Sequence, residues 1–168
     1  SIFKTQSNQR QHYLDLNNRY APAASPDLLS SDLTISFKGR SMKARAEVTC
    51  RNPHAEKLDT LIFSLNPGLV LDTLSLGGDP VDFTRQAQIV KIIPEGGLLP
   101  GSEVHLTCHY SGVPDESLAY LDIPDEEMQT LKRIQVATVD KKPGIFDENF
   151  MVLVPEICWY PMAGVGFN

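Results

Sequence analysis

Two histidines are the side chains of this sequence best suited to bind a metal or to transfer a proton near neutral pH. His105 and His109 are four residues apart in an alternating run, so a strand would place both on its polar face. Cys108 would then point to the opposite face and could not join them. Because a zinc site needs three or four ligands, we expect a solvated strand face and no metal site here.

A group of acidic residues lies between positions 122 and 127, where calcium binding or acid–base chemistry could be considered. Calcium loops need oxygen ligands that alternate along the chain around a sharp glycine turn, and that spacing is absent. Asp122 is instead suited to cap a short helix that ends near Lys132 and Arg133. Acidic residues at the start and basic residues at the end match the helix dipole.

The motifs that organise common catalytic sites are missing. The sequence contains no H-E-x-x-H, no G-x-S-x-G, no P-loop and no G-x-G-x-x-G. We therefore predict no catalytic residue, no metal ligand and no cofactor within these residues, and we do not expect the chain itself to be an enzyme.

The best polar candidates for a functional loop are Asp147, Glu148 and Asn149, which precede a short apolar run. That run is bounded by Gly and Pro and predicts a strand buried on both faces. Trp159 and Tyr160 follow it and are candidates for a contact surface. The structural alternative is a turn before the strand and an aromatic plug at one end of the core.

Composition excludes some partners. The formal net charge is −6, and the 15 Lys and Arg residues form no basic stripe, so nucleic-acid binding is not expected. No window of 18 apolar residues is present that could span a bilayer. Both ends resemble cuts within something longer, so we expect a fragment of a larger protein.

Three cysteines leave two alternatives open. Cys50 and Cys108 both fall on the apolar phase of predicted strands, while Cys158 follows the apolar run near the end. An odd number is not a disulfide framework, and there is no CxxC pair for zinc. Cys50 and Cys108 could form one bridge between sheets, or all three could be buried free thiols, which are common.

The pattern along the chain predicts an all-β fold, an antiparallel β-sandwich or strongly curved sheet with a short N-terminal helix. Residues 1–30 comprise a short helix, from about Gln9 to Asn18, and a linker that leads to the first strand. Residues 31–168 form the sandwich domain, in which the apolar run near residue 152 completes the sheet. The predicted strands cover residues 33–38, 42–50, 58–65, 70–76, 81–84, 89–93, 103–110, 134–139 and 150–154.

The order of these segments resembles the N-terminal β-domain of zinc aminopeptidases of the aminopeptidase N type. Two segments match strand and turn segments of that family. They are Leu58 to Leu65 (LDTLIFSL) and Leu99 to Gly112 (LPGSEVHLTCHYSG). The segment GIFDENFMVLVPEICWYP is similar to a branch in which an aminopeptidase-like region is fused to an ABC-type permease. The positions that fit this branch are Gly144, Phe146, Asn149, Pro155, Tyr160 and Pro161.

This resemblance implies a non-catalytic domain that packs on a downstream metallopeptidase-like domain and helps to form the wall of its peptide cleft. The family's zinc ligands and general base lie in that following domain, so none is carried over to this chain. The implied partners are the downstream domain and a peptide. A membrane would be reached only through flanking spans, with the domain on the extracytoplasmic, periplasmic side of a bacterial membrane.

The alternative is a free-standing immunoglobulin-like, carbohydrate-binding or protein-binding sandwich of a secreted or surface protein. Cys50 and Cys108 on inward phases fit an immunoglobulin pair. However, Trp159 follows both cysteines instead of lying between them, and Leu106 stands where a tyrosine corner needs Tyr. A Cys50–Cys108 bridge would favour this alternative, and free thiols would remove its main support.

Overall fold

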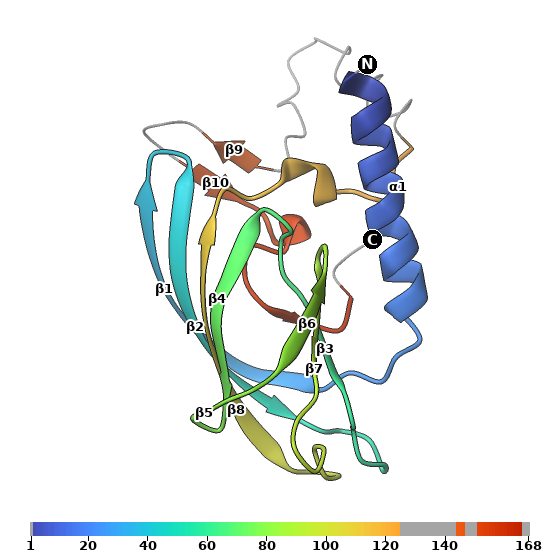
Figure 1. Cartoon of the computed structure of the whole chain (residues 1–168), viewed down its shortest axis with the longest axis vertical. Helices are drawn as coiled ribbons and strands as arrows, with labels where there is room; N and C mark the ends of the chain where they lie inside the picture. Colours follow the sequence, from blue (N-terminus) through green and yellow to red (C-terminus); the bar gives the residue numbers. More distant parts are fainter. Residues whose placement is uncertain (1, 125–143, 147–150, 166–168) are drawn as a thin grey trace.

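Alternating apolar and polar side chains produce the two strands at the centre of the structure, β2 (Ser41–Arg51) and β8 (Glu103–Gly112). The computed structural model describes residues 2–124, 144–146 and 151–165 (Figure 1). Its other elements are α1 (Ile2–Tyr20), β1 (Asp27–Lys38), β3 (Leu61–Ser64), β4 (Leu69–Leu76), β5 (Asp79–Pro80), β6 (Phe83–Gln86), β7 (Ile89–Ile92), β9 (Gly144–Phe146), β10 (Met151–Leu153), β11 (Met162–Ala163) and the 3-10 turns η1 (Glu116–Leu118) and η2 (Pro155–Ile157).

Apart from β9 and β10, the described strands form two antiparallel sheets that face each other. One sheet has the order β1-β2-β8-β4-β5, and the other has the order β11-β3-β7-β6. The first sheet is long and strongly curved, and it wraps around the shorter one (Figure 1). The predicted all-β sandwich with one N-terminal helix is therefore confirmed.

The main core lies between the two sheets and follows the predicted alternation. On β2, Ala44, Ala46 and Val48 are almost fully buried, and the polar residues between them are exposed. Cys108 and Tyr110 on β8 continue this buried face, as the sequence predicted. Burial of such apolar side chains contributes about 25 cal/mol for each Å² removed from water, so this layer is the main source of stability.

The second sheet is covered on both faces, which explains why all four residues of β3 are buried. Leu61 and Phe63 face the main core. Ile62 faces the other way and packs with Leu16 of α1 and Ile89 of β7 in a separate cluster. Helix α1 therefore forms a third layer, upright along the outer face of the shorter sheet (Figure 1).

Helix α1 is longer than the ten residues predicted from the sequence, because tertiary contacts add to its weak helical propensity. The Arg10 guanidinium donates hydrogen bonds to a set of backbone carbonyls in the loop after β8. These acceptors belong to Ser117, Ala119, Tyr120 and Ile123, at 2.7 to 3.1 Å. A charged donor to several carbonyls holds the helix in place more strongly than neutral hydrogen bonds would.

Strand β1 begins at Asp27, earlier than the predicted start at Leu33. Its first residues pair with the end of β2, with Asp27 opposite Arg51, and a bulge at Leu29 shifts the register by one residue. Ser30 and Ser31 interrupt the apolar alternation, so the sequence concealed this part of the strand. The hairpin with β2 supplies the hydrogen bonds that the side-chain pattern did not reveal.

All three cysteines are buried free thiols, so the alternative of a bridge between sheets is wrong. Strands β2 and β8 are neighbours in one sheet, with Cys50 opposite Val104 and Cys108 opposite Ala46. This offset of four residues is about 13 Å along the strands, beyond the roughly 7 Å Cα separation that a disulfide tolerates. The immunoglobulin-like alternative loses its main support.

Two corrections concern the last third of the chain. The apolar run was expected to complete the sheet, but β10 pairs with β9 in a separate two-stranded hairpin among the described residues. Gly144–Phe146 offers a local partner, and Pro155 stops the strand soon after. The predicted helix after Asp122 and the predicted strand at 134–139 fall largely or wholly outside the described residues.

Two buried asparagines, each followed by a proline, hold the loops at opposite ends of the sandwich. Asn66 has 0 % of its surface exposed, and its side chain bonds to three separate segments. Its amide nitrogen donates to the carbonyls of Asp115 (3.0 Å) and Ile157 (2.7 Å). Its amide oxygen accepts from the N–H groups of Gly68 (2.9 Å) and Asp115 (2.6 Å). Asn52 makes a similar set of bonds in the loop toward Leu98.

We expect Asn66→Ala to lower the free energy of unfolding by roughly 3 kcal/mol or more, because several buried backbone groups lose their partners. Urea denaturation followed by circular dichroism measures this change. Asn18→Ala, on the exposed side of α1, is the control and should change stability by less than about 0.5 kcal/mol. Equal effects of the two substitutions would contradict the role given to Asn66.

Candidate interaction surface

Trp159 and Tyr160 form an aromatic pair on the side of the sandwich where β11 is the edge strand. Their ring centroids are 4.8 Å apart and the ring planes meet at 71°, an edge-to-face arrangement. Such a pair contributes about 0.5–1.5 kcal/mol beyond the area that it buries. Both side chains are half-buried, so the pair has one side on the protein and one side on the surface.

The backbone before this aromatic pair is rigidly held. Turn η2 buries Ile157 completely, and Cys158 follows in the left-handed conformation with φ of 51°. The Cys158 carbonyl accepts a 2.8 Å bond from the Asn66 N–H, and the Ile157 carbonyl accepts from the Asn66 side chain. The bonds to Asn66 therefore hold the backbone directly ahead of the two aromatic residues.

The backbone after the pair is held equally well by β3. Met162 pairs with Ser64, and Ala163 pairs with Phe63. The Gly164 N–H donates to the Ile62 carbonyl at 2.8 Å, and the Ser64 hydroxyl donates to the Gly164 carbonyl at 2.9 Å. Because both sides are anchored, a partner could contact Trp159 and Tyr160 without first ordering this segment.

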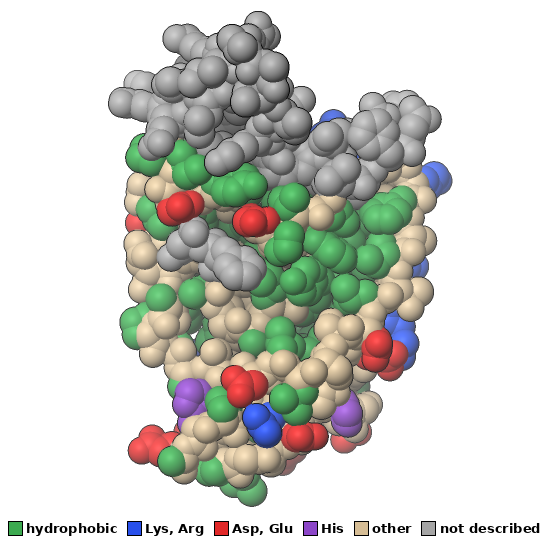
Figure 2. All heavy atoms as spheres, turned by 180° about the vertical axis from the view of Figure 1, so that it is seen from behind, with side chains coloured by type: hydrophobic (Ala, Val, Ile, Leu, Met, Phe, Trp, Pro, Cys, Tyr) green, Lys and Arg blue, Asp and Glu red, His purple; other side chains and the backbone are tan. Residues whose placement is uncertain are grey.

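The two aromatic residues differ in what they contact inside the protein. Trp159 packs against the main core. This contact agrees with the structural alternative, in which the aromatic residues close one end of the core. Tyr160 does not belong to the described core clusters and has more freedom to serve a partner. Figure 2 shows a broad area of hydrophobic side chains on the face that is hidden in Figure 1. Aromatic side chains are common in protein interfaces.

The other candidates from the sequence do not join this surface. Asp147, Glu148 and Asn149 lie outside the described residues, so their role stays a prediction. His105 and His109 lie on the polar face of β8, as predicted, and each imidazole contacts a threonine. Their Nδ1 atoms are 3.0 Å from the Thr49 hydroxyl and 2.9 Å from the Thr73 hydroxyl.

Among residues 2–124, 144–146 and 151–165, no group of three or more His, Cys, Asp or Glu side chains is arranged to hold a metal ion. The space between the two sheets contains a small apolar cavity. It has a volume of about 10 Å³ and is lined by apolar side chains that include Phe63, Ile92 and Pro161. This is room for about one water molecule.

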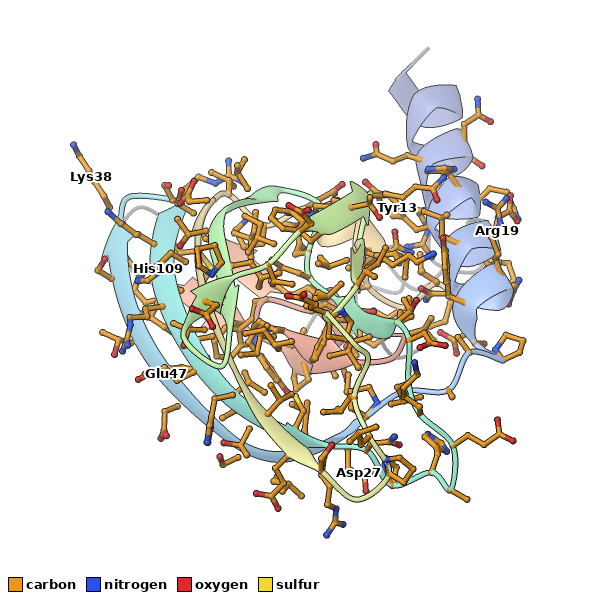
Figure 3. All side chains as sticks on the ribbon, turned by 60° about the horizontal axis from the view of Figure 1, so that its bottom comes forward. Tyr13, Arg19, Asp27, Lys38, Glu47 and His109 are labelled. Carbon is orange, nitrogen blue, oxygen red and sulfur yellow. The ribbon has the colours of Figure 1, made fainter. Side chains whose placement is uncertain are left out.

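A buried polar network between α1, η1 and the β6–β7 hairpin was missed by the sequence analysis. The Tyr13 hydroxyl donates to the Asp115 carboxylate at 2.8 Å and accepts from the Gln9 amide at 2.6 Å. The Gln88 amide donates to the Tyr13 carbonyl at 2.7 Å and to the Asn17 side chain at 3.0 Å. Figure 3 shows Tyr13 pointing from α1 toward the sandwich. The helical spacing of these residues was the available signal.

Arg85 on β6 holds the same region together by donating to backbone carbonyls. Its guanidinium contacts the carbonyls of Ala87 (2.9 Å), Leu65 (3.2 Å), Asn66 (2.6 Å) and Leu69. Burial lowers the pKa of this guanidinium from its ordinary value. The guanidinium groups of Arg10 and Arg85 therefore stabilise loop backbone and are not available to bind an anionic ligand. No helix within the described residues has the length and apolar character needed to cross a membrane.

The described strands place this chain in the class of two-sheet antiparallel sandwiches. Solved structures that share this fold over part of their length include M1 zinc metallopeptidases. A mutant from Deinococcus radiodurans has a TM-score of 0.50 and 21 % identity, with 57 % of this chain and 22 % of that chain covered. A two-domain M1 mutant bound to L-arginine has a TM-score of 0.51 and 22 % identity, with 59 % of this chain and 23 % of that chain covered.

This chain therefore matches less than a quarter of the length of these metallopeptidases. At such identity the likeness establishes the fold. No protein-family model matches the sequence, and no curated protein matches it.

We expect the contact of α1 to weaken at high pH. Burial raises the pKa of Tyr13 from 10.0 to about 12, so the folded state favours the neutral phenol. The resulting stabilisation is complete below pH 10 and is lost as the pH rises toward 12, with an upper limit of roughly 2–3 kcal/mol. Tyr13→Phe should be less stable than the wild type at pH 7 by about 1 kcal/mol. This difference should shrink or reverse above pH 10.

Urea unfolding of both proteins from pH 7 to 11.5 measures this difference, and groups that titrate in both proteins cancel. Tyr20→Phe, on the same helix, controls for the loss of a phenol as such. A difference between wild type and Tyr13→Phe that stays constant over the whole range would refute the burial argument.

Proposed function

We propose that this chain is the non-catalytic β-domain of an aminopeptidase-like protein. In this proposal it packs on a metallopeptidase-like domain of the same polypeptide and forms one wall of that domain's peptide cleft. The observation that carries the proposal is the sandwich fold shared with M1 zinc metallopeptidases over more than half of the chain. Zinc and the catalytic residues belong to the downstream domain.

The sequence segments that resemble the aminopeptidase N type support this proposal, because they build the sandwich. The segment from Leu58 to Leu65 contains β3. Leu58, the first residue of the segment, forms an isolated antiparallel bridge with Leu98. Leu99 to Gly112 contains the turn into β8 and the whole of β8. Two independent segments thus form adjacent layers of the same core, which a chance similarity of turn sequences would not require.

The aromatic pair is the proposed contact with the downstream domain. Trp159 is fixed by the main core, and Tyr160 packs edge-to-face on it. A rigid aromatic residue loses little conformational entropy when it is buried by a partner, so such residues dominate binding energy in many interfaces. Asp147, Glu148 and Asn149 precede the same segment in the sequence and are proposed as the polar part of this contact.

The proposed cellular setting comes from the similarity to the permease-fused branch. Gly144, Pro155 and Tyr160 fit that branch, and the domain would lie on the extracytoplasmic side of a bacterial membrane. Attachment would come from spans outside these residues, and α1 would lead from such a span to the sandwich.

The parent reading frame tests this proposal directly. We expect an H-E-x-x-H motif, or a degenerate form of it, in a domain encoded after Asn168, and apolar spans of about 20 residues before Ser1. A stop codon soon after Asn168 together with a simple signal peptide before Ser1 would overturn the proposal. It would leave a free-standing binding sandwich.

We expect Tyr160→Ala to weaken binding to the separately expressed downstream domain by about tenfold or more, because a fixed aromatic anchor is lost. Isothermal titration calorimetry with the 168-residue chain measures this affinity. The stability cost should be only about 1 kcal/mol, since Tyr160 lies outside the core clusters. Val70→Ala on β4, whose side chain is 63 % exposed, is the control. Equal affinities of all three proteins would exclude Tyr160 from the contact.

A further inference from the structure

Strand β1 has an unusually accessible edge. It is twelve residues long and is the first strand of its sheet, and β2 is its only partner among the described strands. Proteins usually protect such edges with proline, central charges or very short strands, because a free edge can pair with another chain. Between Ser31 and Phe37 the strand has no proline and only one charge, at Asp32.

The side chains near the end of β1 separate into an apolar and a polar face. Leu33, Ile35 and Phe37 lie opposite buried residues of β2 and face the core side of the sheet. Leu33 and Ile35 are only half-buried, and Phe37 is 51 % exposed. The core therefore leaves part of this apolar row uncovered.

The polar face of the same segment is bounded by charges of opposite sign. Asp32 and Lys38 are both exposed, and Figure 3 shows Lys38 pointing away from the body of the protein. Asp32 lies opposite Glu47 of β2, so its neighbour within the sheet has the same charge. A cation on the free side of β1 would offset this repulsion.

This segment is complementary to itself in an antiparallel arrangement. With a two-fold axis at Ile35, Asp32 of one copy lies opposite Lys38 of the other, and Leu33 lies opposite Phe37. Thr34 then lies opposite Ser36, so each directly opposed pair shares one face of the sheet, as antiparallel pairing requires. An axis at Leu33 would instead place Lys38 beside apolar residues of the bulged region. The charges thus favour the register centred on Ile35, which pairs Asp32 with Lys38 twice.

We propose that β1 is a self-association edge, at which a second copy of this chain pairs antiparallel through residues 32–38. The two long sheets then form one continuous sheet across the dimer, and Phe37 becomes covered by Leu33 of the other copy. Strand addition of this kind draws its affinity from main-chain hydrogen bonds and its register from alternate side chains. An isologous contact of this type closes as a dimer, because each copy uses the same β1 edge in the contact.

Sedimentation velocity of the 168-residue chain over a range of concentrations tests the proposal. We expect the wild type to shift from the monomer to twice its mass. Asp32→Lys gives a chain with lysine at both pairing positions, and Lys38→Asp gives a chain with aspartate at both. Each variant should self-associate about tenfold more weakly or worse, because two attractive pairs become repulsive.

An equimolar mixture of the two variants should regain the dimer, since every opposed pair is then oppositely charged. Asp82→Lys in the loop before β6 makes the same charge change as Asp32→Lys away from β1, and this variant should dimerise like the wild type. A wild type that stays monomeric would overturn the proposal and would leave the edge for a strand of another protein. A mixture that remains monomeric while the wild type dimerises would also overturn it.

Discussion

The arrangement of the loops depends on one buried amide, the side chain of Asn66. It lies where β3 ends, and it bonds to the chain before η1, to the end of η2 and to its own turn at Gly68. Each of these segments has backbone groups that water cannot reach, and an unpaired buried group costs about 1–3 kcal/mol. The backbone N–H of the same residue bonds to the Cys158 carbonyl, so Asn66 also holds the chain directly ahead of Trp159. The sandwich supplies stability, whereas Asn66 fixes the geometry of the candidate surface.

The sequence predicted well those features that depend on local pattern. The alternation in β2 and β8 correctly identified the core face, including Cys108 and Tyr110, because period-two patterns report directly on strand faces. It predicted less well where tertiary contacts decide. Helix α1 begins at Ile2, before the predicted start at Gln9. Arg10 supports it through carbonyl acceptors that lie more than 100 residues away in the sequence. No local pattern could reveal that contact.

The candidate site shows the same division. Trp159 and Tyr160 could be identified because a lone Trp beside Tyr and Pro stands out in composition. Whether they form a plug or a contact could not be decided, since that depends on which side of each ring the sheets cover. The polar network of Gln9, Tyr13 and Asp115 went unnoticed because its members are ordinary polar residues, and only the folded chain brings them together.

Within the described residues, the apolar interior is divided into one main core and two smaller clusters, and this division affects the order in which parts of the protein unfold. The residues that attach α1 form two small clusters that are separate from the main core, and polar bonds supply much of the remaining attachment. A unit with few buried apolar contacts opens at a lower free energy than the whole domain. We therefore expect the helix to behave as its own cooperative unit, which can leave and return while both sheets stay folded. A pull on the chain ahead of the sandwich would then be absorbed at the helix before it reached the β-core.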